Sequence, residues 1–147
     1  MLTKIFVTTI AFAGLAVAPS AYAQSAEIIR QLSNQLSEAR SSYVPNNYRL
    51  VTGPDNDILS QGDSDDYNVT LQGGRSYKLI GVCDNDCTDL DITLYDSDGD
   101  VVDRDMLDDD KPVVSVSGKS GGRYRMNVSM ATCSTGSCFY SVAVYGN

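Results

Sequence analysis

The sequence predicts an antiparallel β-sandwich of about six to eight short strands, preceded by one short N-terminal α-helix. From Tyr48 onward, apolar and polar residues alternate with a period of two, which is the pattern of strands with one buried face. Turn-forming Gly, Pro, Asn and Asp residues divide this region at short intervals, as in all-β sandwiches. Only a stretch before Tyr48 has the spacing of an amphipathic helix. We therefore expect an all-β domain with a single helix attached.

The first 23 residues have the form of a secretory signal peptide. Lys4 precedes an apolar run from 5 to 18, and Ala21-Tyr22-Ala23 fits the small-x-small rule for cleavage. The alternative, an uncleaved membrane anchor, fits less well because the apolar run is short and Pro19 follows it at once. We expect cleavage after Ala23, which leaves a mature chain of 124 residues with no stable membrane span and room for one domain. The protein is thus expected to be exported, to the periplasm or the medium.

Residues 24–41 are predicted to form the amphipathic helix, with Ser25 as its N-cap. The apolar residues at helical spacing are Ile28, Leu32, Leu36 and Ala39. Because the pattern covers barely two heptads, it does not predict a coiled coil. Two roles stay open: the apolar stripe packs on the sandwich or frays from it, or it serves docking or dimerisation. Residues 42–56 are expected to form a linker or the first strand, and residues 57–147 the sandwich domain.

The strands are predicted from runs in which every second residue is apolar. The core-facing residues are expected to be Tyr67, Val69 and Leu71; Leu90, Ile92 and Leu94; Val114 and Val116; Tyr124, Met126, Val128 and Met130; and Tyr140, Val142 and Val144. A further strand is expected from Arg75 to Val82, and a short one at Val101-Val102. Asp89, Asp91 and Thr93 alternate with core-facing residues and should lie on the opposite face of their strand.

Three segments are predicted to be turns or loops. Asp96-Ser-Asp-Gly-Asp100 is expected to form a hairpin turn with Gly99 at positive φ. An EF-hand is disfavoured there, because its spacing would place Leu94 at the first ligand position and no helices flank the segment. Residues 108–112 should form a loop, since a proline and three adjacent acids suit neither a helix nor a central strand. Residues 118–122 contain the next turn signal.

Disulfides are predicted because the chain contains an even number of cysteines and is expected to be exported. The four are Cys83, Cys87, Cys133 and Cys138. Zinc is the competing interpretation, but the C-x3-C and C-x4-C spacings and the absence of His from the sequence disfavour it. Four cysteines allow three pairings, and the sequence does not choose among them. We favour Cys83–Cys87 and Cys133–Cys138, since each pair flanks a short turn-forming loop, the second of which is predicted to be a hairpin loop.

The mature chain is strongly acidic. Without Lys4 it contains ten basic and nineteen acidic residues, a net charge of −9. Nucleic acids and anionic membrane surfaces are therefore unsuitable partners. Twelve of the nineteen acidic residues lie between Asp84 and Asp110, where Arg104 is the only basic residue. Such a concentration is typical of a solvated face or of acidic turns, and it also fits a cation site.

The candidate metal site is for calcium. Its ligands would be Asp84, Asp86, Asp89 and Asp91. The last two should project from one face of a strand, and the first two lie in the cysteine loop just before it. Calcium takes six to eight oxygen ligands, which these carboxylates and nearby carbonyl groups would supply. A competing interpretation is an acidic face that is solvated or paired with Arg123 and Arg125, which share one face of a later strand.

The residue types disfavour catalysis. The sequence contains no His, so the commonest general base and the usual Ser/His and Cys/His pairs are absent. Carboxylates are abundant, as a glycosidase requires, but there is no Trp and no aromatic sugar platform beside them. We predict that the protein is not an enzyme, and we name no catalytic or cofactor-binding residue.

The chain resembles the bacterial pre-peptidase C-terminal (PPC-type) domains over roughly residues 57 to 146. The resemblance rests on four segments: Gly73-Gly-Arg-Ser-Tyr77, Asp89-Leu-Asp-Ile-Thr-Leu-Tyr95 with its following Asp-Ser-Asp-Gly turn, Gly122 to Val128, and Tyr140 to Val144. The resemblance implies a jelly-roll-like sandwich, usually a non-catalytic appendage of secreted enzymes. Some members bind calcium, and others bind a polymer or a partner protein. This chain differs from that setting because no peptidase domain precedes the matching region, and the cysteine pairs are similar to those of small exported bacterial proteins.

Two functions are therefore expected from the sequence. The first is an exported, non-catalytic β-sandwich that acts as a structural or interaction module of the cell envelope, with an envelope protein or polymer as its partner. The second is a calcium-dependent binding module that uses the acidic cluster between Asp84 and Asp91, with Ca2+ as its only cofactor.

Overall fold

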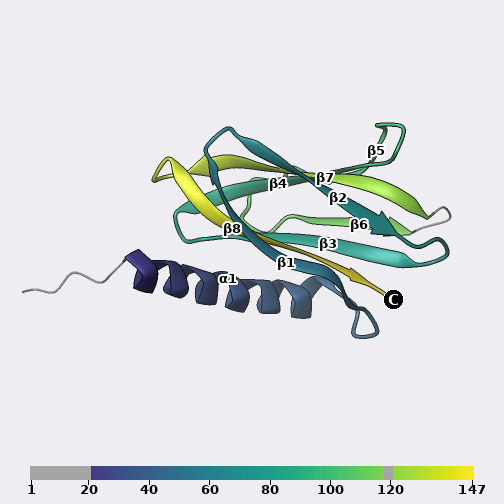
Figure 1. Ribbon diagram of the computed structural model, residues 1–147, viewed down its shortest axis with the longest axis horizontal. Helices are drawn as coiled ribbons and strands as arrows, with labels where there is room; N and C mark the ends of the chain where they lie inside the picture. The colour runs from purple at the N-terminus through teal and green to yellow at the C-terminus, as the bar shows by residue number, and fades with distance from the viewer. Residues whose placement is uncertain (1–20, 118–120) are drawn as a thin grey trace, which may run out of the picture.

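The computed structural model describes residues 21–117 and 121–147, so most of the predicted signal peptide lies outside the described residues. The described chain contains one helix and eight strands arranged in two antiparallel sheets (Figure 1). The elements are α1 (Ala21–Tyr43), β1 (Arg49–Ser60), β2 (Ser64–Leu71), β3 (Ser76–Cys83), β4 (Cys87–Tyr95), β5 (Val101–Asp105), β6 (Val113–Ser117), β7 (Gly122–Cys133) and β8 (Ser137–Gly146). The predicted all-β sandwich with one N-terminal helix is thus confirmed.

The strand order is that of a jelly roll. One sheet, sheet A, has the order β1-β8-β3-β6, and the other, sheet B, has the order β2-β7-β4-β5. The chain crosses between the sheets at every connection except the one from β4 to β5. That connection is the predicted hairpin turn, and Gly99 has the expected positive φ of 89°.

The main core lies between the two sheets and contains the residues predicted to face it. Of these, Tyr67 is half-buried and packs against the core, and the others are buried. Leu90, Ile92 and Leu94 alternate with partly exposed neighbours, as the period of two requires. Burial of each such side chain is worth about 1.5–3 kcal/mol, so β4 is a principal contributor to the stability of the sandwich.

The helix covers the outer face of sheet A and forms a second core with it. Leu32, Leu36 and Ala39 are buried against a set that includes Ile80 and Ala143. The first of the two predicted roles, packing on the sandwich, is therefore confirmed. Because this helix covers one face and the main core the other, β8 is buried along most of both faces. The outer face of sheet B has no such cover (Figure 1).

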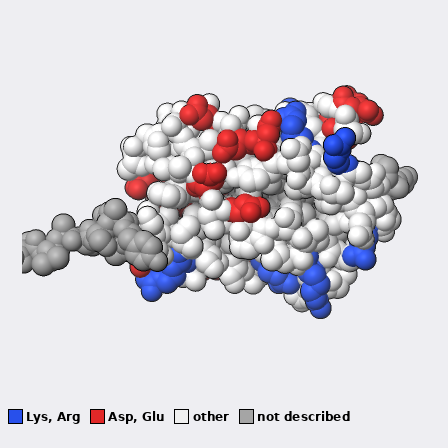
Figure 2. Space-filling view, in the orientation of Figure 1, with Lys and Arg blue, Asp and Glu red and all other residues white. Residues whose placement is uncertain are grey.

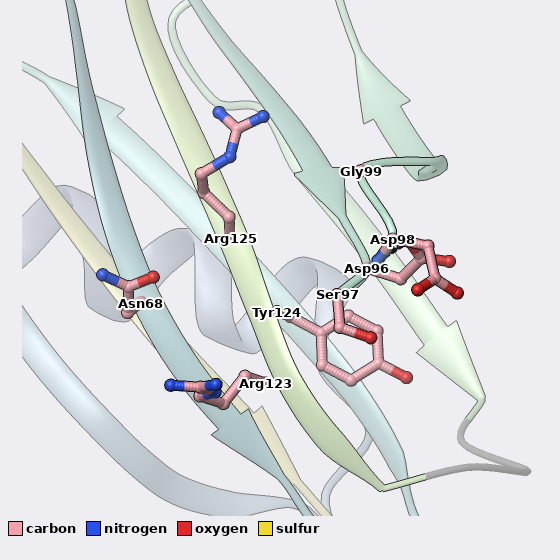
Figure 3. A pocket seen from close by; sticks show the side chains of 8 residues that line it. All are labelled: Asn68, Asp96, Ser97, Asp98, Gly99, Arg123, Tyr124 and Arg125. Carbon is pink, nitrogen blue, oxygen red and sulfur yellow. Dashed lines mark hydrogen bonds between the residues drawn. The ribbon is translucent and has the colours of Figure 1, made fainter.

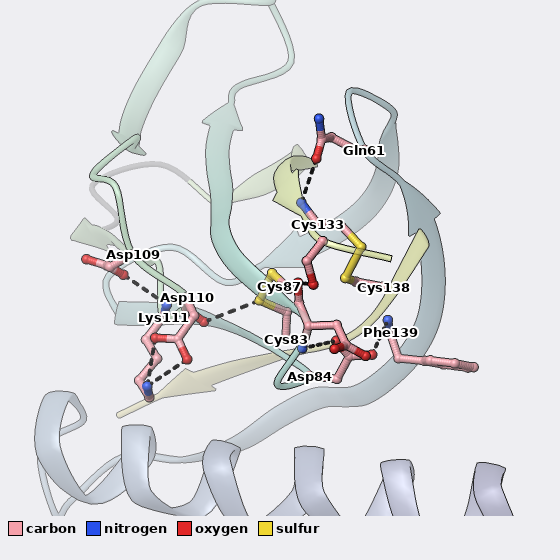
Figure 4. Close-up of a disulfide and its surroundings, with 12 residues drawn as sticks. Gln61, Cys83, Asp84, Cys87, Asp109, Asp110, Lys111, Cys133, Cys138 and Phe139 are labelled. Carbon is pink, nitrogen blue, oxygen red and sulfur yellow. Dashed lines mark hydrogen bonds and ion pairs between the residues drawn. A yellow bond between two sulfur atoms is a disulfide. The ribbon is translucent and has the colours of Figure 1, made fainter. Parts of the chain in front are cut away.

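Both disulfides lie at one end of the sandwich, where the chain crosses between sheets. Cys83 pairs with Cys87 in the β3–β4 connection, and Cys133 pairs with Cys138 in the β7–β8 connection (Figure 4). The favoured pairing is confirmed. The prediction that the second loop is a hairpin loop was wrong, because β7 and β8 belong to different sheets and the loop forms a corner between them.

Hydrogen bonds join the connections at this disulfide end to one another. The Cys133 N–H donates to Oε1 of Gln61, which lies in the β1–β2 connection, at 2.9 Å. The Ser134 N–H donates to the carbonyl of Asp86, in the β3–β4 connection, at 2.8 Å. Three sheet-crossing connections are thereby held together, and the disulfides fix the shapes of two of them.

Candidate functional site

The four predicted calcium ligands do not form one site. Asp84 is buried, and its carboxylate accepts hydrogen bonds from the backbone N–H groups of Asp86 at 3.2 Å and Phe139 at 2.9 Å (Figure 4). It therefore ties the β3–β4 connection to the start of β8. Among the residues that the structure describes, no group of three or more His, Cys, Asp or Glu side chains could hold a metal ion. The geometry does not support the predicted calcium site.

Asp89 and Asp91 lie on the outer face of sheet B, near the start of β4. Burial, and then the charges of Asp108 and Asp109, raise the pKa of Asp89 above its usual value. Burial, and then the nearby carboxylates of Asp89, Asp105 and Asp109, raise the pKa of Asp91. One carboxylate oxygen of Asp89 is enclosed and has no hydrogen-bond partner among the described residues. This end of the face is an acidic cluster whose members destabilise one another.

The proposed pairing of Arg123 and Arg125 with these aspartates was wrong. The β4–β7 register places Asp91 opposite Ser129, whereas Arg125 lies opposite Tyr95. The guanidinium of Arg125 forms an ion pair with Asp66 at 2.9 Å and lies 4.0 Å from the centre of the Tyr95 ring. The acidic cluster and the two arginines therefore lie at different ends of this face, separated along the strands.

Several other acidic residues accept backbone hydrogen bonds. Asp96 accepts from the N–H groups of Asp98 and Asp100, both at 3.0 Å, and so closes the β4–β5 turn. Asp103 accepts from the Ser115 N–H at 2.7 Å. In the same way, the Asp105 carboxylate accepts from the N–H of the first residue of β6 at 2.9 Å. The two carboxylates of β5 thus provide hydrogen-bond acceptors for two backbone N–H groups on the unpaired edge of β6, which belongs to the opposite sheet.

A concavity of the described surface lies on the outer face of sheet B, at the end opposite the disulfides. This hollow has a volume of about 550 Å3 and lies between β2, β7 and the β4–β5 turn (Figure 3). Its lining residues are Asn68, Asp96, Ser97, Asp98, Gly99, Arg123, Tyr124 and Arg125. Volumes of this size are typical of ligand sites. The sequence alone did not reveal the hollow, although the two arginines on one face of a strand were a partial signal.

The polar groups around the hollow differ in how fully they are engaged. Arg125 is held by its ion pair and by the Tyr95 ring. In the described part of the chain, the side chains of Asn68, Ser97 and Arg123 make no hydrogen bond or ion pair. These donors and acceptors therefore remain available to a ligand.

Charge and apolar surface are unevenly distributed around this side of the molecule. Figure 2 shows acidic side chains across the middle and upper part of one face, and most basic ones along the border where α1 and sheet A lie. The edge strand β5 and the residues after it expose four large apolar side chains. These are Val101, Val102, Met106 and Leu107, which are 51%, 38%, 61% and 67% exposed. The uncovered side thus combines a polar hollow with an apolar edge.

Comparison with known protein families and with curated proteins gave no match. Among solved structures, the chain is similar to a periplasmic lysozyme inhibitor of g-type lysozyme, PliG from Aeromonas hydrophila, with 10% sequence identity and a TM-score of 0.48. The match covers 68% of this chain and 86% of the PliG chain. The resemblance to PPC-type domains stays a prediction. Within the described residues, no helix is long and apolar enough to span a membrane.

Proposed function

We propose that this protein is an exported, non-catalytic binding module of the cell envelope, and that it binds an envelope polymer in the hollow of sheet B. One observation carries the proposal: α1 covers the outer face of sheet A, whereas the outer face of sheet B is uncovered and concave, with unengaged polar groups around the hollow. Small molecules are usually bound in pockets that enclose most of their surface, whereas an open hollow on a sheet suits one unit of a longer polymer chain.

The chemistry of the side chains supports a non-catalytic role. The sequence has no His, and all four cysteines are in disulfides. The buried Tyr140 hydroxyl lies 3.0 Å from a carboxylate oxygen of Asp65 and 2.6 Å from the Tyr67 hydroxyl. Burial, and then these two hydrogen bonds, raise the pKa of Tyr140, so its hydroxyl stays protonated and serves packing.

Export is supported by the two disulfides together with the predicted signal peptide. Disulfides persist in oxidising compartments, such as the periplasm or the medium. Polysaccharide and peptidoglycan are the abundant polymers that a protein in such a compartment meets, so they are the first ligands to test.

Co-sedimentation with purified insoluble polymers tests the proposal. The oxidised chain of residues 24–147 should sediment with peptidoglycan sacculi or with an acidic polysaccharide gel. The double variant Asn68→Ala/Arg123→Ala should bind at least about fivefold more weakly, because it removes the unengaged donors of one wall. Arg30→Ala is the matched control, since Arg30 lies on α1 and pairs only with Glu27 at the surface. Sedimentation that the double variant leaves unchanged would exclude the hollow as the site.

The apolar edge along β5 favours a second candidate, a protein partner. Met106 and Leu107 are exposed within a segment that also carries Asp105 and Asp108, so the complementary partner surface would be apolar and basic. Replacing both apolar residues by serine should abolish cross-linking to such a partner in intact envelopes, whereas Ile29→Ser on the exposed face of α1 should not.

A further inference from the structure

The two arginines at the hollow have different roles. Arg125 is fixed from two sides, by its ion pair with Asp66 at 2.9 Å and by the ring of Tyr95 at 4.0 Å. The carboxylate of Asp66 also accepts a hydrogen bond from the Asn127 amide at 2.8 Å. These contacts, the Asn127 hydrogen bond first, hold the pKa of Asp66 below its usual value. Arg125 therefore belongs to a preorganised network and forms part of the wall.

Arg123 has no such partner among the described residues, and it lies two residues from Arg125 on the same face of β7. In Figure 3 its side chain extends from β7 towards β2, the strand that carries Asn68, and both residues line the hollow. In the β2–β7 register Asn68 is opposite Arg125 and Thr70 is opposite Arg123, so Asn68 is a diagonal neighbour of Arg123. The guanidinium of Arg123 and the carboxamide of Asn68 both carry N–H donors on this side of the hollow, and such donors suit a carboxylate.

The opposite wall of the hollow presents a hydroxyl and a carboxylate. Ser97 and Asp98 lie in the β4–β5 turn, which Asp96 holds closed through two backbone hydrogen bonds of 3.0 Å. In Figure 3 the carboxylates of this turn lie on the side away from Arg123. A ligand that spans the hollow therefore meets donors on one side and acceptors on the other. Sugar hydroxyl groups donate readily to such acceptors.

The acidic cluster that contains Asp89 and Asp91 lies away from the hollow. Asp91 lies opposite Ser129, which is six residues from Arg123 along β7, or roughly 20 Å at 3.4 Å per residue. That separation exceeds the Debye length of about 8 Å at physiological ionic strength. The hollow itself combines Arg123 and Arg125 with Asp96 and Asp98, so an anionic group is favoured only on the wall that carries the arginines.

We infer that the polymer unit bound in the hollow is an acidic sugar, whose carboxylate is held by Arg123 and Asn68 and whose hydroxyl groups face Ser97 and Asp98. The inference rests on the proposed function and specifies its ligand. Arg125 acts as a positioning residue, because its contacts with Asp66 on β2 and Tyr95 on β4 join three neighbouring strands beside the hollow. Arg123 is the specificity-determining residue, since among the described lining residues it is the one basic side chain without an ion pair.

Titrations with matched sugars test the assignment. The oxidised mature chain is titrated with galacturonic acid against galactose, and with N-acetylmuramic acid against N-acetylglucosamine, and binding is followed by backbone amide shifts in NMR spectra. The acidic member of at least one pair should bind about tenfold more tightly, as expected for a charge-assisted bidentate contact. Shifts should be concentrated at residues 66–70, 95–100 and 123–126.

Point variants distinguish the loss of the contact between Arg123 and the carboxylate from a loss of the fold. Arg123→Gln should reduce the affinity for the acidic sugar to that for its neutral counterpart. Arg123→Lys should retain part of the affinity difference, because lysine keeps the positive charge but lacks the planar guanidinium that forms two parallel hydrogen bonds to a carboxylate. Arg104→Gln lies outside the hollow and should change the discrimination by less than about twofold. Thermal melts confirm that each variant is folded.

Three results would overturn the inference. Equal affinities for acidic and neutral sugars would show that the hollow does not recognise a carboxylate. The proposed function would still hold in that case if polymer co-sedimentation depended on Asn68 and Arg123. If the Arg123→Gln variant still bound the acidic sugar more tightly than the neutral one, the anion site would lie elsewhere. Tighter binding of acetyl-D-alanyl-D-alanine than of any acidic sugar would assign the carboxylate to a peptide terminus instead.

Discussion

At the scale of single residues, several aspartates act as backbone acceptors. Asp84, Asp96, Asp103, Asp105 and Asp109 each accept at least one backbone N–H. A carboxylate in this role stabilises a turn or an edge that would otherwise need water or a further strand. Asp89 and Asp91 have no such role among the described residues, and their pKa values are raised.

Asp89→Asn should therefore stabilise the protein at neutral pH. Because the pKa of Asp89 in the folded state lies above the ordinary 3.8, the folded state binds protons more tightly than the unfolded state does. Stability is then lost as the pH rises from below 3.8 through the raised value, and the loss is constant above it. We expect a gain of about 0.5 kcal/mol at pH 7, on the scale of partly exposed charge interactions. Urea unfolding at pH 7 and pH 3 measures it, and an equal gain at both pH values would contradict the electrostatic cause.

Tyr140→Phe should destabilise the protein by about 1–2 kcal/mol. The change leaves Asp65 and the half-buried Tyr67 without the hydroxyl that joins them, and an unmet buried polar group costs about this much. Chemical denaturation measures the loss. Tyr43→Phe is the control, because Tyr43 is 49% exposed and should change the free energy of unfolding by less than about 0.5 kcal/mol.

At the scale of elements, the two edge strands β5 and β6 depend on each other across the sheets. Asp103→Ala/Asp105→Ala should lower the free energy of unfolding by about 2 kcal/mol, since it removes acceptors from two edge N–H groups. Hydrogen exchange of the Val113 and Ser115 amides should become faster, whereas that of Leu79 in β3 should follow only the global loss. Unchanged exchange at the two β6 amides would show that water replaces the carboxylates.

The sequence predicted those elements whose signals are local. Alternation along β4 and β7 identified core residues because each strand has one face on the main core and one face in solvent. It could not show that β8 is buried on both faces, since that depends on where α1 packs. The partners of Asp103 and Asp105 lie twelve and eight residues away on another sheet, and no spacing rule relates them. The hollow likewise depends on three elements meeting.

At the scale of the whole molecule, the two ends of the jelly roll differ in how firmly they are held. The disulfide end has two cross-links and shared backbone hydrogen bonds. The sequence predicted both disulfides correctly because each closes a loop of only a few residues. The hollow lies at the other end, where the β4–β5 turn is closed by a single aspartate.

Removing both disulfides should therefore weaken the fold more than it alters the binding site. Replacing all four cysteines by serine should lower the free energy of unfolding by about 2 kcal/mol for each small loop that is opened. Sugar affinity of the remaining folded molecules should change by less than about twofold, because the hollow shares no residue with either loop. Denaturation and NMR titration at low temperature measure the two quantities. A large affinity loss without unfolding would show that the two ends are coupled.

The outward position of the β4–β5 turn has a consequence for protein engineering. Residues 97–100 are exposed or nearly so, and Gly99 adopts its conformation without any side chain nearby. The turn at 72–75 is exposed at the same end. Both segments would tolerate randomised residues at positions other than Gly74 and Gly99, whose positive φ favours glycine, while the cross-linked end retains the strand order. The fold thus offers a small, oxidation-stabilised scaffold on which new recognition loops could be selected.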